Sequence, residues 1–282
     1  MTRTRHHTGQ YRFKIGLLAL LGIFFLWSGP CARAETDKEH YPIGQLVALE
    51  GRAFYAADDT HTPMKLNDPV FLNTTVETGP ESKALIMFVD NTEITLGPES
   101  EILIDEYVFD PYDAEENKGR FEMTKGAFLW VSGLLSKRTV PDVAIKTKVG
   151  SIGIRGTKFW GGNVETDLYG VYVFDGLIHY TTQNGQVLLP KDHGVMTGGE
   201  TAPLSTKSWP ANQLDSAVQS VTFSHPEEVA QAVSAQKEKN IAGQHDYRGR
   251  MFPYKPNPLA PHLKDKNGKF FSDEFEKFKD QK

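Results

Sequence analysis

Short apolar runs separated by turn-forming residues dominate the chain between Ile43 and about residue 190. Ala84–Val89 is a continuous run of six apolar residues, which is short for a helix and typical of a buried strand. Glu93–Leu96 alternates polar and apolar residues, the period of a strand with one exposed face. Because no helical periodicity interrupts the series, the pattern predicts an antiparallel all-β core. Three segments are expected at its centre: Ala84–Val89, Ala127–Val131 and Ile152–Ile154.

A hairpin is predicted around Asn184 and Gly185, which separate the apolar segments Ile178–Tyr180 and Val187–Leu189. Asparagine and glycine accept the positive φ angles that a two-residue type I′ turn requires. We therefore expect these two residues to be the centre of the turn.

The composition changes after Gly199, and two helices are expected before the chain becomes rich in proline and lysine. The first covers Leu214–Val221, with Asn212 as a cap, and the second begins near Pro226 and runs to about Asn240. The sequence thus predicts a β domain over residues 40–195, a linker with helices over 203–245, and a Pro/Lys-rich tail over 246–282.

Residues 1–34 have the three parts of a cleavable export signal. A basic head precedes the apolar run Ile15–Trp27, and the small residues Ala32 and Ala34 occupy the positions that a signal peptidase reads. The run has 13 residues, fewer than the roughly 20 that a membrane-spanning helix needs. We expect cleavage before Glu35 and a periplasmic location without a stable membrane span. An uncleaved anchor and a lipid anchor on Cys31 are the alternatives.

Cleavage would change the charge and remove the only cysteine of the chain. Residues 1–34 hold five of the 31 basic residues and none of the 36 acidic ones, which leaves 26 against 36 and a net charge of −10. This balance gives no basic footprint for nucleic acid. A domain without cysteine has no disulfide, so its stability depends on burial.

No catalytic or metal-binding motif is found, and we expect neither a catalytic residue, a metal nor a cofactor. The histidines after residue 34 show no pair at the spacing of metal ligands on one helix face, and no nucleophile elbow or phosphate loop is present. An acidic stretch offers oxygen ligands for calcium, but its spacing matches no known calcium loop, so a solvated turn is favoured. This stretch contains Asp105, Glu106, Asp110, Asp113, Glu115 and Glu116.

The most informative segment is Thr147–Gly162. Ile152 and Ile154 alternate with Gly153, and Gly156 indicates a bulge or tight bend. Arg155 is a single charge among small and apolar residues. A guanidinium can tie several carbonyl groups together, so we expect Arg155 to brace the β core, with a ligand or partner contact as the alternative.

This segment resembles the signature of the FecR domain, the periplasmic module of ferric-siderophore signalling proteins and of many other exported proteins. Two further blocks, Ser82–Ser100 and Val171–Ile178, resemble the family in the same order. The resemblance implies a rolled β-sandwich or a solenoid-like stack, here with a short helical, Pro-rich C-terminal extension. The signature residues are Thr147, Gly150, Ile152, Gly153, Ile154, Arg155, Gly156 and Thr157.

The signalling role of FecR itself is not expected to carry over, because only 14 residues precede the apolar run where a sigma-binding region would stand. We predict an exported, non-enzymatic binding or scaffolding module whose partner is an envelope protein or a glycan. The first alternative is an envelope signalling component that contacts an outer-membrane receptor or a membrane partner. The second is an enzyme whose site the sequence does not reveal.

Overall fold

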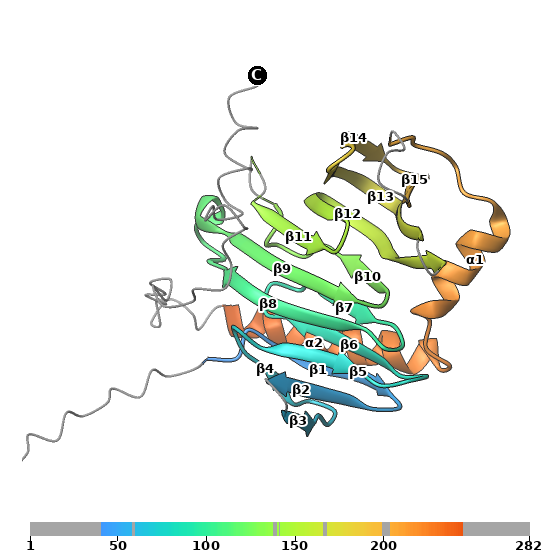
Figure 1. Ribbon diagram of the computed structural model, residues 1–282. Helices are drawn as coiled ribbons and strands as arrows, with labels where there is room; N and C mark the ends of the chain where they lie inside the picture. Colours follow the sequence, from blue (N-terminus) through green and yellow to red (C-terminus); the bar gives the residue numbers. More distant parts are fainter. Residues whose placement is uncertain are drawn as a thin grey trace, which may run out of the picture. The chain divides into compact units, whose positions relative to one another are not determined.

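The computed structural model describes residues 41–244, apart from 58–59, 138–139, 141, 166–167 and 199–203 (Figure 1). The predicted export signal with Ala32 and Ala34, Cys31, and the tail at 246–282 lie outside the described residues. Within them, 15 strands form one hydrogen-bonded sheet and two α-helices follow it. The strands are β1 (Gly44–Glu50), β2 (Ala53–Ala57), β3 (Thr60–Pro63), β4 (Pro69–Val70), β5 (Thr75–Thr78), β6 (Lys83–Phe88), β7 (Glu93–Leu96), β8 (Glu101–Val108), β9 (Lys118–Lys125), β10 (Phe128–Val131), β11 (Val143–Thr147), β12 (Gly150–Glu165), β13 (Leu168–Thr182), β14 (Gly185–Pro190) and β15 (His193–Thr197).

The sheet curls because its longest strand belongs to two halves. The strand order is β3-β2-β5-β8-β9-β11-β12-β10-β7-β6-β1-β4, and β13 lies beside β12. The first part of β12 pairs with β11, as in Ile152 opposite Ile145, and its later part pairs with β10, as in Trp160 opposite Leu129. The all-β prediction is confirmed. The sheet is antiparallel except for β9 and β11, which run parallel.

Aromatic side chains from both halves meet in one core. Phe88 of β6 stacks on Tyr107 of β8 at a centroid distance of 5.3 Å and meets Phe121 of β9 edge-on at 5.6 Å. Phe121 in turn contacts Trp130 of β10 at 5.0 Å. Strands far apart in the sheet order therefore face each other, which is the rolled arrangement. Ala84–Phe88 and the pair Ile152 and Ile154 are buried in the domain, as expected.

A fully buried carboxylate, Asp90, joins three segments of the roll at the turn between β6 and β7. It accepts hydrogen bonds from the Thr92 amide (3.1 Å), the Thr92 hydroxyl (2.6 Å), the Tyr107 hydroxyl (2.7 Å) and the Leu135 amide (2.7 Å). The Asp90 carbonyl also accepts the Leu134 amide at 2.9 Å. A buried charge is tolerated only when hydrogen bonds replace its lost hydration. Asp90 thus fastens β8 and the loop after β10 to the β6–β7 turn.

The β13–β14 hairpin is present, but its turn differs from the predicted one. Thr182 pairs with Gly185, so Gln183 and Asn184 are the turn residues. Gly185 has a φ of 125°, whereas Asn184 is not among the residues with positive φ. The type I′ prediction was wrong because glycine is the first residue of the returning strand.

Both predicted helices are present, as α1 (Ala211–Ser220) and α2 (Pro226–Gln244). Asn212 is not a cap: the helix is preceded by Pro210, and no side chain caps it. Phe223 and one side of α2 pack on the outer face of β1 and β6, against Val47 and Met87. Asn240 of α2 donates to the Phe88 carbonyl at 2.9 Å. The helices therefore belong to the same compact unit as the strands.

We expect Asp90→Ala to lower the free energy of unfolding by at least about 3 kcal/mol, because it leaves several buried donors without an acceptor. Chemical denaturation monitored by tryptophan fluorescence measures this loss. Asp68→Ala is the matched control, since Asp68 also accepts a backbone amide, that of Lys65 at 2.8 Å, but at an exposed turn. The control should lose about 1 kcal/mol or less. Equal losses would show that the Asp90 network contributes nothing beyond an ordinary turn.

Candidate functional site

The signature segment forms the bend of β12 where this strand passes from one half of the sheet to the other. The pairing of β12 with β13 shifts register between Arg155 and Lys158. We call residues Arg155–Lys158 the corner. The bulge expected at Gly156 is present there.

Two glycines face each other at the corner and make it possible. Gly156 has a φ of 57° and Gly176 of β13 has a φ of 85°. A Cβ atom on Gly176 would lie 2.3 Å from the Gly156 carbonyl oxygen, whereas a Cβ atom on Gly156 would meet nothing within 4 Å. Gly156 is therefore required for its backbone angle alone, and Gly176 for both angle and space.

Hydrogen bonds with the loop after β10 and within the signature itself fix its two ends. The Thr157 amide donates to Ser132 Oγ at 3.0 Å, and the Ser132 amide donates to the Thr157 carbonyl at 2.9 Å. At the other end, the Thr147 hydroxyl donates to the Gly150 carbonyl at 2.9 Å. A Cβ atom on Gly150 would lie 2.2 Å from the Thr181 carbonyl oxygen. Most signature residues thus shape the backbone of β12.

Arg155 is the exception, because its side chain is exposed. Within the described residues it makes no hydrogen bond or ion pair, so the predicted bracing role is wrong. Alternation along β12 places Arg155 on the face opposite the buried Ile152 and Ile154, and the register shift after it brings Thr157 and Phe159 to the buried face. Lys158, at the other end of the corner, is exposed as well. The corner therefore presents two cations to solvent.

An aromatic cluster continues from the corner along the outer face of β12 and β13. Lys158 Nζ lies 5.9 Å from the centroid of Phe174, and Phe174 contacts Tyr172 at 5.2 Å. Tyr172 and Trp160 both contact Trp209, which precedes α1. Ala217 and Val221 complete the buried part of this cluster. Sequence reasoning missed the cluster because its members lie far apart in the chain.

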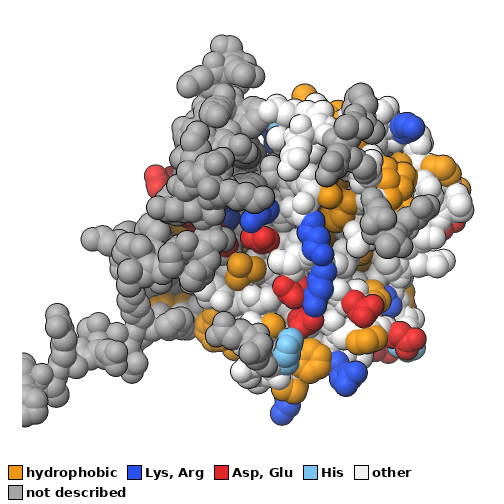
Figure 2. Space-filling view, viewed as in Figure 1, with side chains coloured by type: hydrophobic (Ala, Val, Ile, Leu, Met, Phe, Trp, Pro, Cys, Tyr) orange, Lys and Arg blue, Asp and Glu red, His pale blue; other side chains and the backbone are white. Residues whose placement is uncertain are grey.

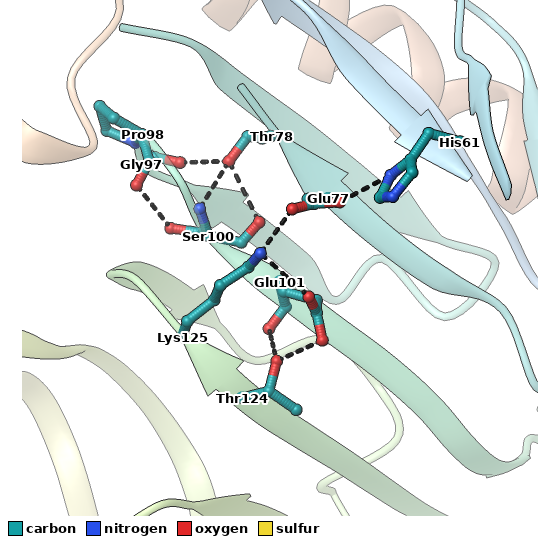
Figure 3. A network of polar contacts seen from close by, with 9 residues as sticks. All are labelled: His61, Glu77, Thr78, Gly97, Pro98, Ser100, Glu101, Thr124 and Lys125. Carbon is teal, nitrogen blue, oxygen red and sulfur yellow. Dashed lines mark hydrogen bonds and ion pairs between the residues drawn. The ribbon is translucent and has the colours of Figure 1, made fainter. Parts of the chain in front are cut away.

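The opposite outer face, over β5, β8 and β9, carries charges that neutralise one another. Figure 2 shows acidic and basic side chains interspersed there. In Figure 3, Lys125 lies between Glu77 and Glu101, and His61 approaches Glu77 from its other side. The distances are 3.2 Å from Lys125 to Glu101 and 2.9 Å from His61 to Glu77. Thr124 donates to Glu101 at 2.6 Å. The cations of this network have acidic partners, whereas Arg155 and Lys158 of the corner form no ion pair within the described residues.

The pKa of two carboxyl groups on this face is shifted in opposite directions, each by its own surroundings. The hydrogen bond from Lys125 holds the pKa of Glu77 below its ordinary value, and the same contact raises the pKa of Lys125. Asp105 of β8 behaves in the opposite way. Burial, with the charges of Glu106 and Glu122 beside it, raises its pKa despite the nearby cations Arg120 and Lys146.

In the acidic stretch, two carboxylates accept hydrogen bonds from nearby backbone amides. Asp110 accepts the Tyr112 amide at 2.8 Å, and Asp113 accepts the Glu115 amide at 3.2 Å. A short 3₁₀ helix, Ala114–Glu116, follows. In the part of the chain that the structure describes, no group of three His, Cys, Asp or Glu side chains is placed to hold a metal ion.

The described histidines are dispersed over the fold. His61 pairs with Glu77, and Nδ1 of His193 lies 2.9 Å from the Lys191 carbonyl. Burial lowers the pKa of His179 on β13. His225, ahead of α2, is exposed and lies 3.8 Å from Glu227.

Part of the chain is similar to a known protein family. Residues 74–179 match the family model described as FecR protein. No curated protein matches the chain in sequence. Two crystal structures of a proposed anti-sigma factor from Parabacteroides distasonis ATCC 8503 are similar, with TM-scores of 0.41 and identities of 14% and 15%. The matches cover 52% of this chain and 64% and 65% of those chains, so the chain spans less than two thirds of their length. Among the described residues, no helix is both long and apolar enough to cross a membrane.

Gly176→Ala should destabilise the protein more than Gly156→Ala. Both substitutions place alanine at a positive φ, which costs about 1–2 kcal/mol, but only Gly176→Ala also brings a Cβ atom against a backbone carbonyl. Thermal unfolding followed by circular dichroism compares the two variants. Equal melting temperatures would contradict the assigned close contact.

Asp105→Asn and Glu77→Gln should change stability in opposite directions at neutral pH. A carboxyl group with a raised pKa stabilises the fold below its unfolded pKa and loses that contribution as pH rises, so Asp105→Asn should be more stable than the parent at pH 7. A lowered pKa gives stability that is present above the unfolded value and is lost on acidification, so Glu77→Gln should lose about 0.5–1 kcal/mol at pH 7. Denaturation between pH 3 and 7 should show both differences shrinking toward pH 3. Differences independent of pH would contradict the assigned directions.

Proposed function

We propose that the protein is an exported, non-enzymatic binding module of the bacterial cell envelope, and the match of residues 74–179 to the FecR family model supports this proposal. The export signal expected at residues 1–34 supports a periplasmic location. The observation that carries the binding role is the corner. A bend formed by two glycines at positive φ presents Arg155 and Lys158 to solvent without ion-pair partners in the described residues.

The chemistry of the corner selects an acidic partner. A guanidinium binds a carboxylate through two parallel hydrogen bonds, and the nearby ammonium adds charge. The net charge of −10 expected after cleavage makes this local positive site stand out against an acidic protein. The partner is therefore an envelope protein segment, or a glycan, that carries carboxylates.

An envelope signalling component is the second candidate, and the packing of the C-terminal helices favours it. Trp209 and α1 lie on the same face of β12 and β13 as Lys158. A partner that binds the extension would therefore act on the face that includes the corner. The scaffold and the signalling component differ in whether binding moves the extension.

The double variant Arg155→Ala/Lys158→Ala should lose at least tenfold in affinity for an acidic envelope partner while its melting temperature stays within a few degrees, because neither side chain is buried. Affinity capture from envelope extract with the parent protein identifies the partner, and titration measures the affinity. The double variant Arg52→Ala/Lys65→Ala is the charge-matched control, since Arg52 between β1 and β2 and Lys65 in the turn before β4 are both exposed. Unchanged partner affinity in the double variant would refute the assignment of the corner.

A further inference from the structure

The segment before α1, residues 204–210, binds to the surface of the β domain through one backbone bridge and one buried side chain. We call it the strap. Its Lys207 pairs with Gly194 of β15 through two backbone hydrogen bonds of 2.8 and 2.9 Å. Two residues later, Trp209 is almost completely buried. The strap thus combines an extended backbone contact with one deeply inserted side chain.

The seat of Trp209 is shaped for an indole. Its floor consists of Gly170 on β13 and Gly194 on β15: added Cβ atoms would lie 2.5 Å from Trp209 Cη2 and 2.3 Å from Trp209 Nε1, respectively. Trp160 forms an edge-on wall at a centroid distance of 5.8 Å, and Tyr172 a tilted wall at 5.3 Å. We call this site the tryptophan pocket. Aromatic pairs in these geometries add stability beyond the area they bury.

Trp209 is the one buried side chain of the strap, whereas the buried Val221 and Phe223 and a hydrogen bond from Trp160 to Ser220 (3.1 Å) hold the helices that follow it. Ala217 is the one buried residue of α1, and among the described side chains of α2 none is fully buried. Segments with few buried apolar contacts open at low free energy compared with core strands. The strap can therefore leave the pocket without unfolding of the sheet.

The strap makes no ion pair with Lys158, the cation that lies next to the pocket. Tyr172 of the pocket contacts Phe174, and Phe174 contacts Lys158 of the corner. Residues 204–210 contain no acidic side chain and carry a cation, Lys207. A competing segment that has both a tryptophan and carboxylates would gain ion pairs that the strap does not make. Such a difference in affinity is what displacement of a resident segment requires.

We propose that the tryptophan pocket is a docking site for an extended peptide segment that bears a tryptophan and acidic residues, and that the strap occupies this site in the resting protein. Recognition combines strand addition at β15 with the insertion of an aromatic anchor. The acidic part of the proposal rests on the proposed function of the corner. The aromatic part does not.

The test uses the variant Trp209→Ala of the whole protein, whose pocket the strap no longer fills. A synthetic peptide of residues 204–212 should bind this variant, and should bind the parent protein at least tenfold more weakly, because the strap competes there. The same peptide with tryptophan replaced by alanine should not bind. Isothermal titration calorimetry measures the three affinities. A folded Trp209→Ala variant that fails to bind the peptide would overturn the proposal.

Two further peptides separate the pocket from the corner. Each carries two added aspartates, at one end or at the other. The one whose aspartates reach the corner should bind Trp209→Ala up to roughly fivefold more tightly than the unmodified peptide, the effect of an exposed ion pair. Adding Lys158→Ala should remove this gain and leave the binding of the unmodified peptide intact. If the peptides bind but neither gains, the pocket stands and the acidic partner of the corner is refuted.

A measurement on the parent protein keeps the proposal testable if Trp209→Ala does not fold. An excess of the tighter peptide should increase hydrogen exchange at the Lys207 amide, which the strap otherwise donates to Gly194. Exchange in the centre of β13 should stay unchanged. Unchanged exchange at Lys207 with peptide at saturating concentration would show that the strap is a permanent part of the fold and contradict displacement.

Discussion

The buried carboxylate of Asp90 is the constraint on which the rolled sheet depends. A charge without access to water must be surrounded by donors, and here they come from the β6–β7 turn, from β8 and from the loop after β10. Those segments lie in different halves of the sheet. The rolled sheet brings these segments together around Asp90, and the aromatic contacts among Phe88, Phe121 and Trp130 fill its interior.

The signature segment has a structural part and an exposed part, and the division explains how one motif serves both fold and surface. Glycines and threonines set the path of β12, while Arg155 points to solvent from the bend that they create. The same outer face continues through Lys158 and Phe174 to the pocket of Trp209. Cation and aromatic surface therefore form one continuous region, in which the C-terminal extension already takes part.

Sequence reasoning predicted what depends on local pattern. The apolar run Ala84–Val89 identified a core strand because burial on both faces leaves no polar positions, and the start signal at Pro226 predicted α2. Contacts between distant residues were beyond its reach. The sequence around Asp90 does not indicate that the Tyr107 hydroxyl donates a hydrogen bond to it. Likewise, Gly170 and Gly194 form the floor of the tryptophan pocket only because β13 and β15 lie side by side in the fold. The bracing role given to Arg155 was wrong because alternation with the buried Ile152 and Ile154 places its side chain on the outer face.

The long strand β12 has a consequence for cooperativity. It is hydrogen-bonded to β11 in one half and to β10 in the other, and β13 runs beside it along both parts. If either half separated from β12, the backbone N–H and C=O groups of one ladder would lose their hydrogen-bond partners. The two halves should therefore melt as a single unit, so that a partner which steadies the bend at Gly156 raises the barrier to opening for the whole domain.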